Sequence, residues 1–263
     1  MRPIVFEIGG VGVPAFFFMI MVGALAATFY AVHVAKKEGA DEVAILDFGI
    51  IGIIAAVIGA RFFHIIVENP SYYIERPIRV FFFWQGGFVS IGAYIFTIIG
   101  WIIYMKKRGL DYWRYFDIAA VAVPVIIFFV RSGCFMAGCC YGKPTDFFIH
   151  LRFFNPAALA ARYGFLGVAL HATQVYFMLN AVIMFFVLHF VYAKRKFHGQ
   201  VLASFFIYYG LSRFLIEFLR GDADRGMWFG GYVSTGQIAM LFSFLGGIAM
   251  WFIFSKKNRE LNG

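Results

Sequence analysis

Long apolar stretches alternate with short polar segments along the whole chain. Seven such stretches cover approximately residues 11–35, 45–67, 86–105, 117–139, 172–192, 200–219 and 233–254. A helix of about 20 apolar residues is long enough to cross a hydrocarbon core about 30 Å thick. The pattern therefore predicts an all-α, polytopic membrane protein with about seven transmembrane helices.

The first stretch contains the run Gly-Ala-Leu-Ala-Ala at 23–27, which resembles the cleavage site of a signal peptide. The apolar run is longer than the hydrophobic region of a signal peptide, and only Arg2 and Glu7 carry charge ahead of it. We therefore expect residues 11–35 to be retained as a helix.

The segments between the stretches contain no Pro/Ser-rich linker, low-complexity tract or convincing repeat, so a single transmembrane domain over residues 1–263 is expected. The longest of these segments, at about 141–170, is rich in phenylalanine. We expect it to lie in the outer interface of the membrane with its aromatic rings among the headgroups. Residues 68–80 contain Pro70 and Pro77 and predict a turn with a second interfacial stretch.

The composition agrees with a membrane protein. Hydrophobic residues make up 62% of the chain and charged residues 14%, and the mean hydropathy is +0.79. Soluble domains are about half apolar and a quarter charged. Lipid is therefore the expected main solvent of this chain.

Lys and Arg gather on one side of the predicted helices, at 36–37, 106–114, 194–196 and 256–259. Cytoplasmic loops retain such residues, so we expect the N-terminus outside and the C-terminus inside. The opposite side also carries basic residues, spread over longer segments, so the asymmetry is moderate. We interpret the net charge of +9 as attraction to anionic membrane lipids, because no nucleic-acid-binding pattern is present.

Three arginines, Arg61, Arg131 and Arg213, lie inside apolar stretches, where each costs roughly 2.5 to 3.5 kcal/mol. The second, fourth and sixth predicted helices all run outward, and each arginine comes fourteen residues after the predicted helix start. These starts are Asp47, Asp117 and Gly199. Fourteen residues rise about 21 Å, so the three arginines are expected at one depth in the outer half of the membrane, where they converge on an anion.

Arg61 has an alternative to ligand binding. It shares a helix face with His64 and Glu68, so an ion pair with Glu68 stays open for it.

Arg213 shares a face with Tyr209, Glu217 and Arg220. Glu217 offsets only one positive charge, so an excess remains. A phosphate or another anionic headgroup is its natural partner.

Three further motifs fall at the outer ends of predicted helices, at 86–87, 138–142 and 171–174. Glycine pairs let a backbone approach a ligand closely, although packing explains most membrane glycines. His171 alone is more often an interfacial residue than a catalyst. The neighbouring motifs make it a candidate.

The three cysteines, Cys134, Cys139 and Cys140, form neither a paired disulfide framework nor a CxxC metal motif. We expect them to fill a tight helix as small residues, and a redox-linked pair facing the oxidising side is the alternative. No metal or other cofactor is expected.

Five motifs follow one another from the third to the seventh predicted helix. They are WQGGFVSIGAY (84–94), RSGCFMAGCCYGKPTD (131–146), HATQVY (171–176), YGLSRFLIEFLRGDADRG (209–226) and STGQ (234–237). In order and spacing they resemble the motifs of the prolipoprotein diacylglyceryl transferase family, and GARFFH (59–64) fits as well.

The resemblance implies a seven-helix enzyme of the bacterial inner membrane with its active site towards the outer leaflet. The family transfers the diacylglyceryl group of phosphatidylglycerol to the thiol of the lipobox cysteine of a preprolipoprotein and releases glycerol phosphate. Its essential arginines fall on Arg131 and Arg213. Further family positions fall on Tyr209, Glu217, Arg220, Gly142, His171 and Gln174.

The departures from the family pattern are informative. The usual His after the Gly-Gly pair is Ile91, and Tyr94, on the same helix face, is expected to substitute. Two usual polar residues of the signature motif are Cys134 and Cys139, and the Glu that closes the fifth-helix motif is Phe177. These changes leave the residues expected to bind phosphate intact. They affect the residues expected to act in acid–base catalysis.

The expected chemistry gathers negative charge on a phosphate oxygen, which fixed arginines stabilise, and it requires removal of a thiol proton. In this hypothesis Glu217 orients Arg213. The catalytic candidates are Arg131, Arg213, His171 and Tyr94. The candidates for binding phosphatidylglycerol are Arg61, Arg131, Arg213, Tyr209, Glu217, Arg220, Gln174 and Gly142.

Two alternatives stay open. The first is a divergent family member that has an altered lipid donor or acceptor, or that binds lipid without catalysis. Ile91 is the reason to retain this alternative. An anion transporter also needs converging arginines but does not predict the ordered motifs. A retinal pigment is excluded, because every Lys lies in a loop or near a helix end.

Overall fold

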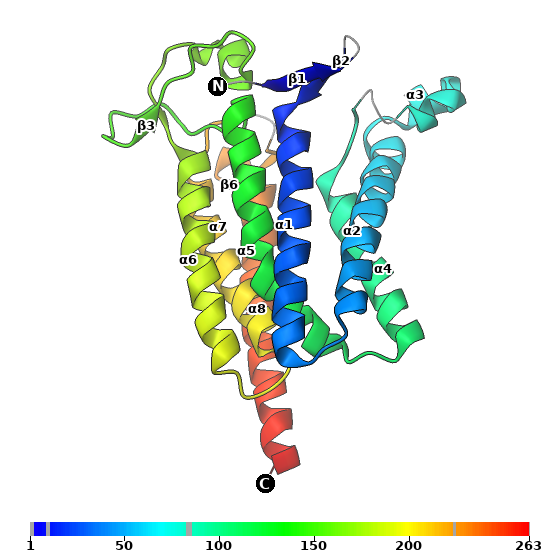
Figure 1. The fold of residues 1–263 in the computed structure, drawn as a ribbon. Coiled ribbons are helices and arrows are strands. Elements are labelled where there is room, and N and C mark those ends of the chain that lie inside the picture. The colour runs from blue at the N-terminus through cyan, green and yellow to red at the C-terminus, as the bar shows by residue number, and fades with distance from the viewer. Residues whose placement is uncertain (1–2, 9–10, 83–85, 223–224, 263) are drawn as a thin grey trace. The chain divides into compact units, whose positions relative to one another are not determined.

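A computed structural model describes residues 3–8, 11–82, 86–222 and 225–262, and Arg2 lies outside them. This part of the chain is mostly helical. Long helices lie on all seven predicted stretches (Figure 1). They are α1 (Ala15–Glu38), α2 (Glu42–Phe63), α4 (Ser90–Arg108), α5 (Tyr112–Ala137), α6 (Thr173–Ala193), α7 (Gln200–Glu217) and α8 (Thr235–Asn262).

Within the described residues, five helices are long and apolar enough to cross a membrane. They are α1, α2 with its continuation to Glu68, α5, α6 and α8 as far as Asn258. The helices α4 and α7 are shorter, with 19 and 18 residues. The predicted class, a helical membrane protein, is thereby confirmed.

The chain divides into two compact units. The larger unit comprises Met1–Ala31 and Phe116–Gly263, and the smaller unit comprises Val32–Tyr115. In the larger unit α7 packs against both α6 and α8, and in the smaller unit α2 packs against α4. Glycine permits the close approach of α7 and α8, because a Cβ added at Gly210 would lie 2.7 Å from the backbone nitrogen of Phe244.

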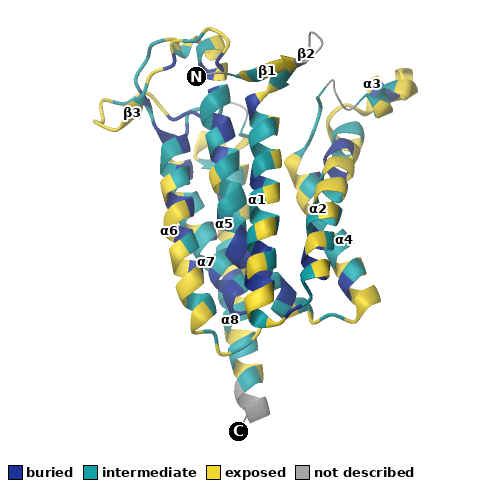
Figure 2. Ribbon diagram, viewed as in Figure 1, coloured by how far each residue is buried: buried dark blue, intermediate teal, exposed yellow. Residues whose placement is uncertain are grey.

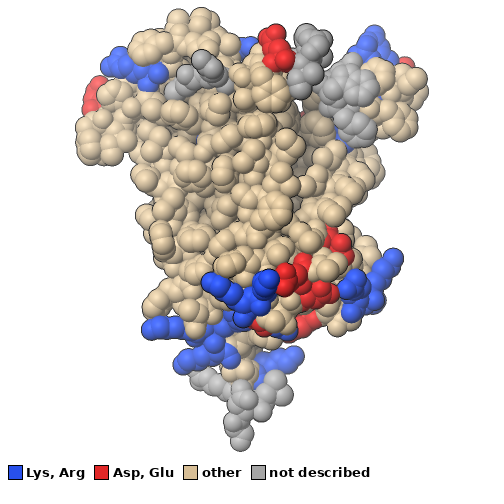
Figure 3. All heavy atoms as spheres, viewed as in Figure 1, with Lys and Arg blue, Asp and Glu red and all other residues tan. Residues whose placement is uncertain are grey.

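The long helices expose large apolar side chains, as a lipid environment requires (Figure 2). On α6, Ile183 and Phe186 are 55% and 66% exposed, and on α8 Phe242 and Phe252 are 71% and 69% exposed. In Figure 3 the visible surface along α1 and α6 is uncharged, and Lys and Arg gather near helix ends. These faces are suited to acyl chains rather than water.

The chain before α1 forms a hairpin, whereas the sequence analysis begins the first helix at residue 11. Strand β1 (Ile4–Ile8) pairs with β2 (Val11–Pro14) in antiparallel fashion. Proline disfavours the helical conformation of the residue before it, here Val13, so the helix begins only after Pro14.

The outer segment of the larger unit has a small core of its own. Strand β3 (His150–Leu151) pairs with β4 (Leu170–His171), and a π-helix, η4 (Ala161–Phe165), lies between them. Phe148 and Phe154 are 80% and 74% exposed, but Phe153 is 1% exposed. The expectation that all its phenylalanines lie among headgroups is therefore wrong for Phe153, whose ring fills the segment's core.

The segment at 68–80 of the smaller unit, predicted as a turn with an interfacial stretch, consists largely of short helices. These are the π-helix η1 (His64–Glu68), α3 (Pro70–Glu75) and the 3-10 helix η2 (Pro77–Phe81). Pro70 and Pro77 each begin a helix, a position where proline is favoured. The larger unit has a comparable entry to α8, formed by β5 (Met227–Trp228), η5 (Phe229–Gly231) and β6 (Val233–Ser234).

Candidate functional site

Two of the three arginines from the apolar stretches meet in the larger unit. Arg131 on α5 and Arg213 on α7 both lie over the ring of Phe177 on α6, with their ζ carbons 4.1 Å and 5.7 Å from the ring centroid. Phe177 is fully buried. A guanidinium over an aromatic face is attracted by the ring quadrupole, so Phe177 holds both cations close to one point.

Their common depth has a structural origin at the other end of the helices. The Asp117 carboxylate on α5 accepts hydrogen bonds from the backbone nitrogens of Gly199 and Leu202, both at 2.9 Å. The contact ties α5 to the first turn of α7. Because Arg131 and Arg213 follow these two positions by equal numbers of residues, they reach the same level.

Tyr209 completes this pair. It lies one turn before Arg213 on α7, and its hydroxyl accepts a hydrogen bond of 3.1 Å from Arg213 Nη1. Tyr209 also interacts electrostatically with both arginines. Among the described residues, the buried Nε of Arg213 has no hydrogen-bond partner and its guanidinium has no carboxylate partner. The site thus has a donor and a positive charge available for an anion.

The predicted binding residue Gln174 fixes the backbone beside Arg131. Its Nε2 donates to the carbonyl of Cys139 at 2.8 Å, and the neighbouring Thr173 hydroxyl donates to the carbonyl of Cys140 at 2.7 Å. Both side chains are fully buried. The start of α6 is therefore joined to the chain that leaves α5, and Gln174 has a positioning role.

His171 and Gly142 are in direct contact. A Cβ added at Gly142 would lie 2.9 Å from the carbonyl carbon of His171, so only glycine fits there. The His171 backbone donates to the carbonyl of Lys143 at 3.0 Å. Within the described part of the chain, the buried His171 Nδ1 makes no hydrogen bond, which leaves a ring nitrogen for a proton or a ligand.

Glu217 is buried at the end of α7 and has partners other than the expected Arg213. Its carboxylate accepts a hydrogen bond of 3.2 Å from Arg220 and lies 3.6 Å from Arg225. The Ser234 hydroxyl donates to it at 3.3 Å. Glu217 therefore stabilises the segment between α7 and α8, and among the described contacts none joins it to Arg213.

Arg220 is held by two carboxylates. Its guanidinium donates to both oxygens of Asp222, at 3.0 and 2.5 Å, in addition to Glu217. Burial lowers the pKa of Arg220, but the hydrogen bond to Asp222 and the nearby acidic groups raise this pKa by more, so the guanidinium stays charged. Its charge is largely balanced already, unlike that of Arg213.

Backbone pairing brings the signature segments of α5 and α7 together. Gly142 and Arg220 form an antiparallel bridge. The Gly221 nitrogen donates to the Tyr141 carbonyl at 2.9 Å, and the Lys143 nitrogen donates to the Leu219 carbonyl at 2.8 Å. The motifs at 131–146 and 209–226 are thus neighbours, although Ala223 and Asp224 lie outside the described residues.

Arg61, the third arginine, lies in the smaller unit and binds backbone. It is 4% exposed, and all five of its N–H donors bond to carbonyl oxygens. The acceptors are Arg79, Val80, Phe82, Gly86 and Gly87, at 2.5–3.3 Å. The alternative expected for Arg61 was an ion pair with Glu68. In the structure Glu68 contacts His64 instead, with 2.6 Å between Oε2 and Nδ1.

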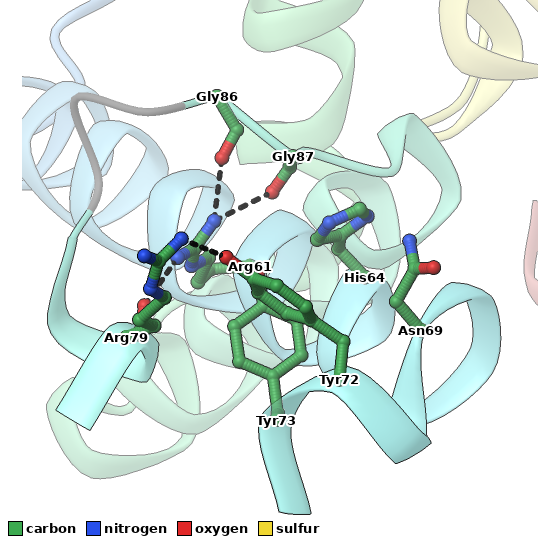
Figure 4. A pocket seen from close by; sticks show the side chains of 8 residues that line it. All are labelled: Arg61, His64, Asn69, Tyr72, Tyr73, Arg79, Gly86 and Gly87. Atoms are coloured by element: carbon green, nitrogen blue, oxygen red, sulfur yellow. Dashed lines mark hydrogen bonds between the residues drawn. The ribbon is translucent and has the colours of Figure 1, made fainter. Parts of the chain in front are cut away.

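A cavity of about 340 Å³ adjoins Arg61 and is also lined by His64, Tyr72, Tyr73 and Arg79 (Figure 4). The Arg79 guanidinium donates to the Tyr72 hydroxyl. The motif residues Trp84 and Gln85 lie outside the described part of the chain.

Tyr94 is also in the smaller unit, on α4. Tyr94 and Ile91 are 69% and 57% exposed, as expected for residues one turn apart on one face. The role of Tyr94 in the reaction stays a prediction.

Phe177 organises the site but was predicted only as a departure from the family pattern, not as a site residue. A signal was present, because an aromatic ring replaces a carboxylate one turn after Thr173 and Gln174. The partners of that ring are on α5 and α7, however, and the sequence does not show that these helices face it.

Comparison with known proteins agrees with this geometry. The family model of prolipoprotein diacylglyceryl transferase matches residues 3–253. The chain is 33% identical to phosphatidylglycerol–prolipoprotein diacylglyceryl transferase of Clostridium tetani, over 97% of each chain. It is 30% identical to transferase 2 of the same name from Clostridium perfringens, over 100% of this chain and 99% of the relative. It is 32% identical to the Vibrio vulnificus enzyme, over 94% and 89%.

The match extends across both units and includes every segment that supplies Arg61, Arg131 and Arg213. This chain belongs to the prolipoprotein diacylglyceryl transferase family, a family of transferases.

Proposed function

We propose that this protein transfers the diacylglyceryl group of phosphatidylglycerol to the lipobox cysteine of preprolipoproteins, forming a thioether and releasing glycerol phosphate. The names of its relatives specify phosphatidylglycerol and prolipoprotein. The observation that carries the proposal is the meeting of Arg131 and Arg213 on Phe177.

The reaction breaks the bond between a glyceryl carbon and a phosphate oxygen while a carbon–sulfur bond forms. The electron pair of the broken bond leaves with the phosphate oxygen, so negative charge develops there. Arg131 and Arg213 stabilise it, because their positions are fixed before the reaction by Phe177 and Tyr209. Glu217, Arg220, Gln174 and Gly142 hold the surrounding segments in place.

The thiol proton must pass to a base before or during attack. His171 is the candidate in the larger unit, because its Nδ1 is buried and makes no hydrogen bond among the described residues. Tyr94 is the candidate in the smaller unit. Arg61 contributes through the backbone it binds, which includes the Gly86 and Gly87 of the family motif.

In the membrane, we place this chain as a single domain with seven spanning helices, its N-terminus outside and its C-terminus inside. Helices on all seven apolar stretches and basic residues in the last turns of α1 and α4 support this arrangement. The outer segment at 141–170 lies at the interface, and the site opens towards the outer leaflet of the bacterial inner membrane. The reaction requires no cofactor.

The direct test is lipid transfer from radiolabelled phosphatidylglycerol to a synthetic lipobox peptide by purified Arg131→Ala and Arg213→Ala variants. Each is expected to lose activity by about 10²- to 10³-fold, the usual loss when a transition-state donor is removed. The exposed Arg162 of the outer segment supplies the control, since Arg162→Ala should keep full activity. Full activity in both arginine variants would overturn the proposal.

A divergent family member is the second candidate, because Ile91 and Phe177 replace residues of the family pattern. Expression in a bacterium depleted of its own transferase separates the two. Rescue of growth with phosphatidylglycerol as donor supports the main proposal. Lipid transfer in vitro without rescue, or transfer from another phospholipid, supports the altered substrate.

A further inference from the structure

The three cysteines converge at the end of α5. Cys134 lies in the last turn of the helix and is 2% exposed, whereas Cys139 and Cys140 follow the helix end at Ala137. The helix was expected to continue to residue 139, but Gly138 adopts a φ of +68° and turns the chain back. As a result, the three sulfur atoms lie within 4.8 Å of one another.

The backbone that carries these thiols is fixed from two sides. The Cys139 nitrogen donates to the Cys134 carbonyl at 3.1 Å, while Thr173 and Gln174 bind the carbonyls of Cys140 and Cys139. Cys140 has a φ of +55°, a left-handed conformation that a side chain adopts only when its surroundings enforce it. These contacts fix the backbone that carries the thiols, and the Cys139 thiol itself donates to the Cys134 carbonyl at 3.8 Å.

The surrounding charge favours the thiolate form of Cys140. Arg131 and Arg220 both interact electrostatically with the Cys140 sulfur. Three thiolates around one divalent cation leave one excess negative charge, and two guanidiniums nearby stabilise such a centre. The adjacent arginines would instead disfavour a cation bound by neutral ligands.

We propose that Cys134, Cys139 and Cys140 form a three-thiolate site for a soft d10 cation of the Zn²⁺ or Cu⁺ class. Zinc–sulfur bonds of about 2.3 Å place sulfurs about 3.8–4.0 Å apart, so small side-chain rotations close the present spacing around a metal. Each coordinated thiol releases its proton to solvent, and no sulfur is oxidised. Three protein ligands leave a fourth position open.

This site is separate from the phosphate chemistry proposed above but adjoins it through Arg131. A divalent metal bound by three thiolates forms a centre with a net negative charge beside the Arg131 guanidinium, and this centre competes with the lipid phosphate for that guanidinium. We therefore expect metal loading to raise the KM for phosphatidylglycerol, which makes the site a candidate for regulation by metal.

The test is titration of the reduced, detergent-purified full chain with Cd²⁺, read out by the ultraviolet charge-transfer band of cadmium thiolates. One equivalent is expected to bind per chain. Cys134→Ser, Cys139→Ser and Cys140→Ser should each weaken binding by at least about tenfold, because even outer-shell partners contribute that much. His150→Gln, at an exposed histidine of the outer segment, should bind Cd²⁺ as the parent does.

Helix content by circular dichroism distinguishes loss of the site from loss of the fold, and Cys139→Ser replaces a thiol that is less buried than that of Cys134. Absence of the band in the reduced parent protein, or its survival in all three serine variants, would overturn the proposal. So would a disulfide between two of these cysteines in protein alkylated directly in cells. Because the band is measured without lipid or peptide, its outcome is independent of the transferase assay.

Discussion

Phe177 converts two separate arginines into one cationic site. Its uncharged ring holds the guanidiniums without neutralising them. A carboxylate at this position would bind the arginines more strongly and would compete with a phosphate. A phenylalanine at this position therefore leaves the negative charge of a bound substrate, rather than a carboxylate of the protein, as the partner of Arg131 and Arg213.

Replacing Phe177 by Leu should remove the interaction with both cations while filling much of the same space. A cation–π contact of this kind contributes about 0.5–2 kcal/mol, so transfer activity should fall by roughly 2- to 30-fold. Phe177→Tyr keeps the aromatic face and should retain most activity. The measurement is kcat/KM for phosphatidylglycerol, and equal activities of the Leu and Tyr variants would contradict the proposed role of the ring.

At the scale of elements, the close packing of α7 on α8 depends on glycine. A Cβ at Gly210 meets the backbone of α8, with Met240 oxygen at 2.9 Å and Phe244 nitrogen at 2.7 Å. Backbone atoms cannot rotate away as a side-chain end can. The two helices would have to separate, and α7 would carry Arg213 with it.

We therefore expect Gly210→Ala to lower the free energy of unfolding by about 1–3 kcal/mol, the usual cost of overpacking. Gly246 on α8 provides a matched control, because no described atom lies within 4 Å of the Cβ that it would gain. Gly246→Ala should leave stability unchanged or slightly raised. Thermal unfolding in the same detergent compares them, and equal melting temperatures would argue against tight α7–α8 packing.

How far the sequence predicts these elements depends on which interactions define them. The helices follow from their apolar length, since lipid requires a backbone that satisfies its own hydrogen bonds. The hairpin β1–β2 was missed because residues 11–14 were counted with the first apolar stretch, and the core around Phe153 because it joins residues between Tyr141 and Leu170 that are not neighbours in the chain. The convergence of Arg131 and Arg213 was predictable from their spacing, whereas the partner of Glu217 was not, since several arginines are within reach.

At the scale of the whole molecule, the net charge of +9 is distributed unevenly. Lys36 and Lys37 occupy the last turn of α1, and Lys106 and Lys107 occupy the last turn of α4. There they stabilise the negative end of the helix dipole as well as satisfying the positive-inside rule. Both effects favour the same orientation in the membrane.

This orientation predicts the behaviour of fusion proteins. Green fluorescent protein fused after residue 263 should fluoresce, because it folds in the cytoplasm, and alkaline phosphatase fused at the same point should be inactive. Alkaline phosphatase inserted after Glu75, in the short-helix segment of the smaller unit, should be active outside. The opposite pattern at either position would reverse the proposed topology.

The five carbonyls around Arg61 act on the charge as a hydration shell would. A charged group that leaves water is stable only when other dipoles replace the solvent. Around Arg61, backbone carbonyls at 79–82 and 86–87 are these dipoles. The arginine has no donor left for a lipid phosphate, and that backbone cannot relax without desolvating a cation. Arg61 and the glycine motif therefore depend on each other in this structure, where the buried charge holds the conformation of the chain around it.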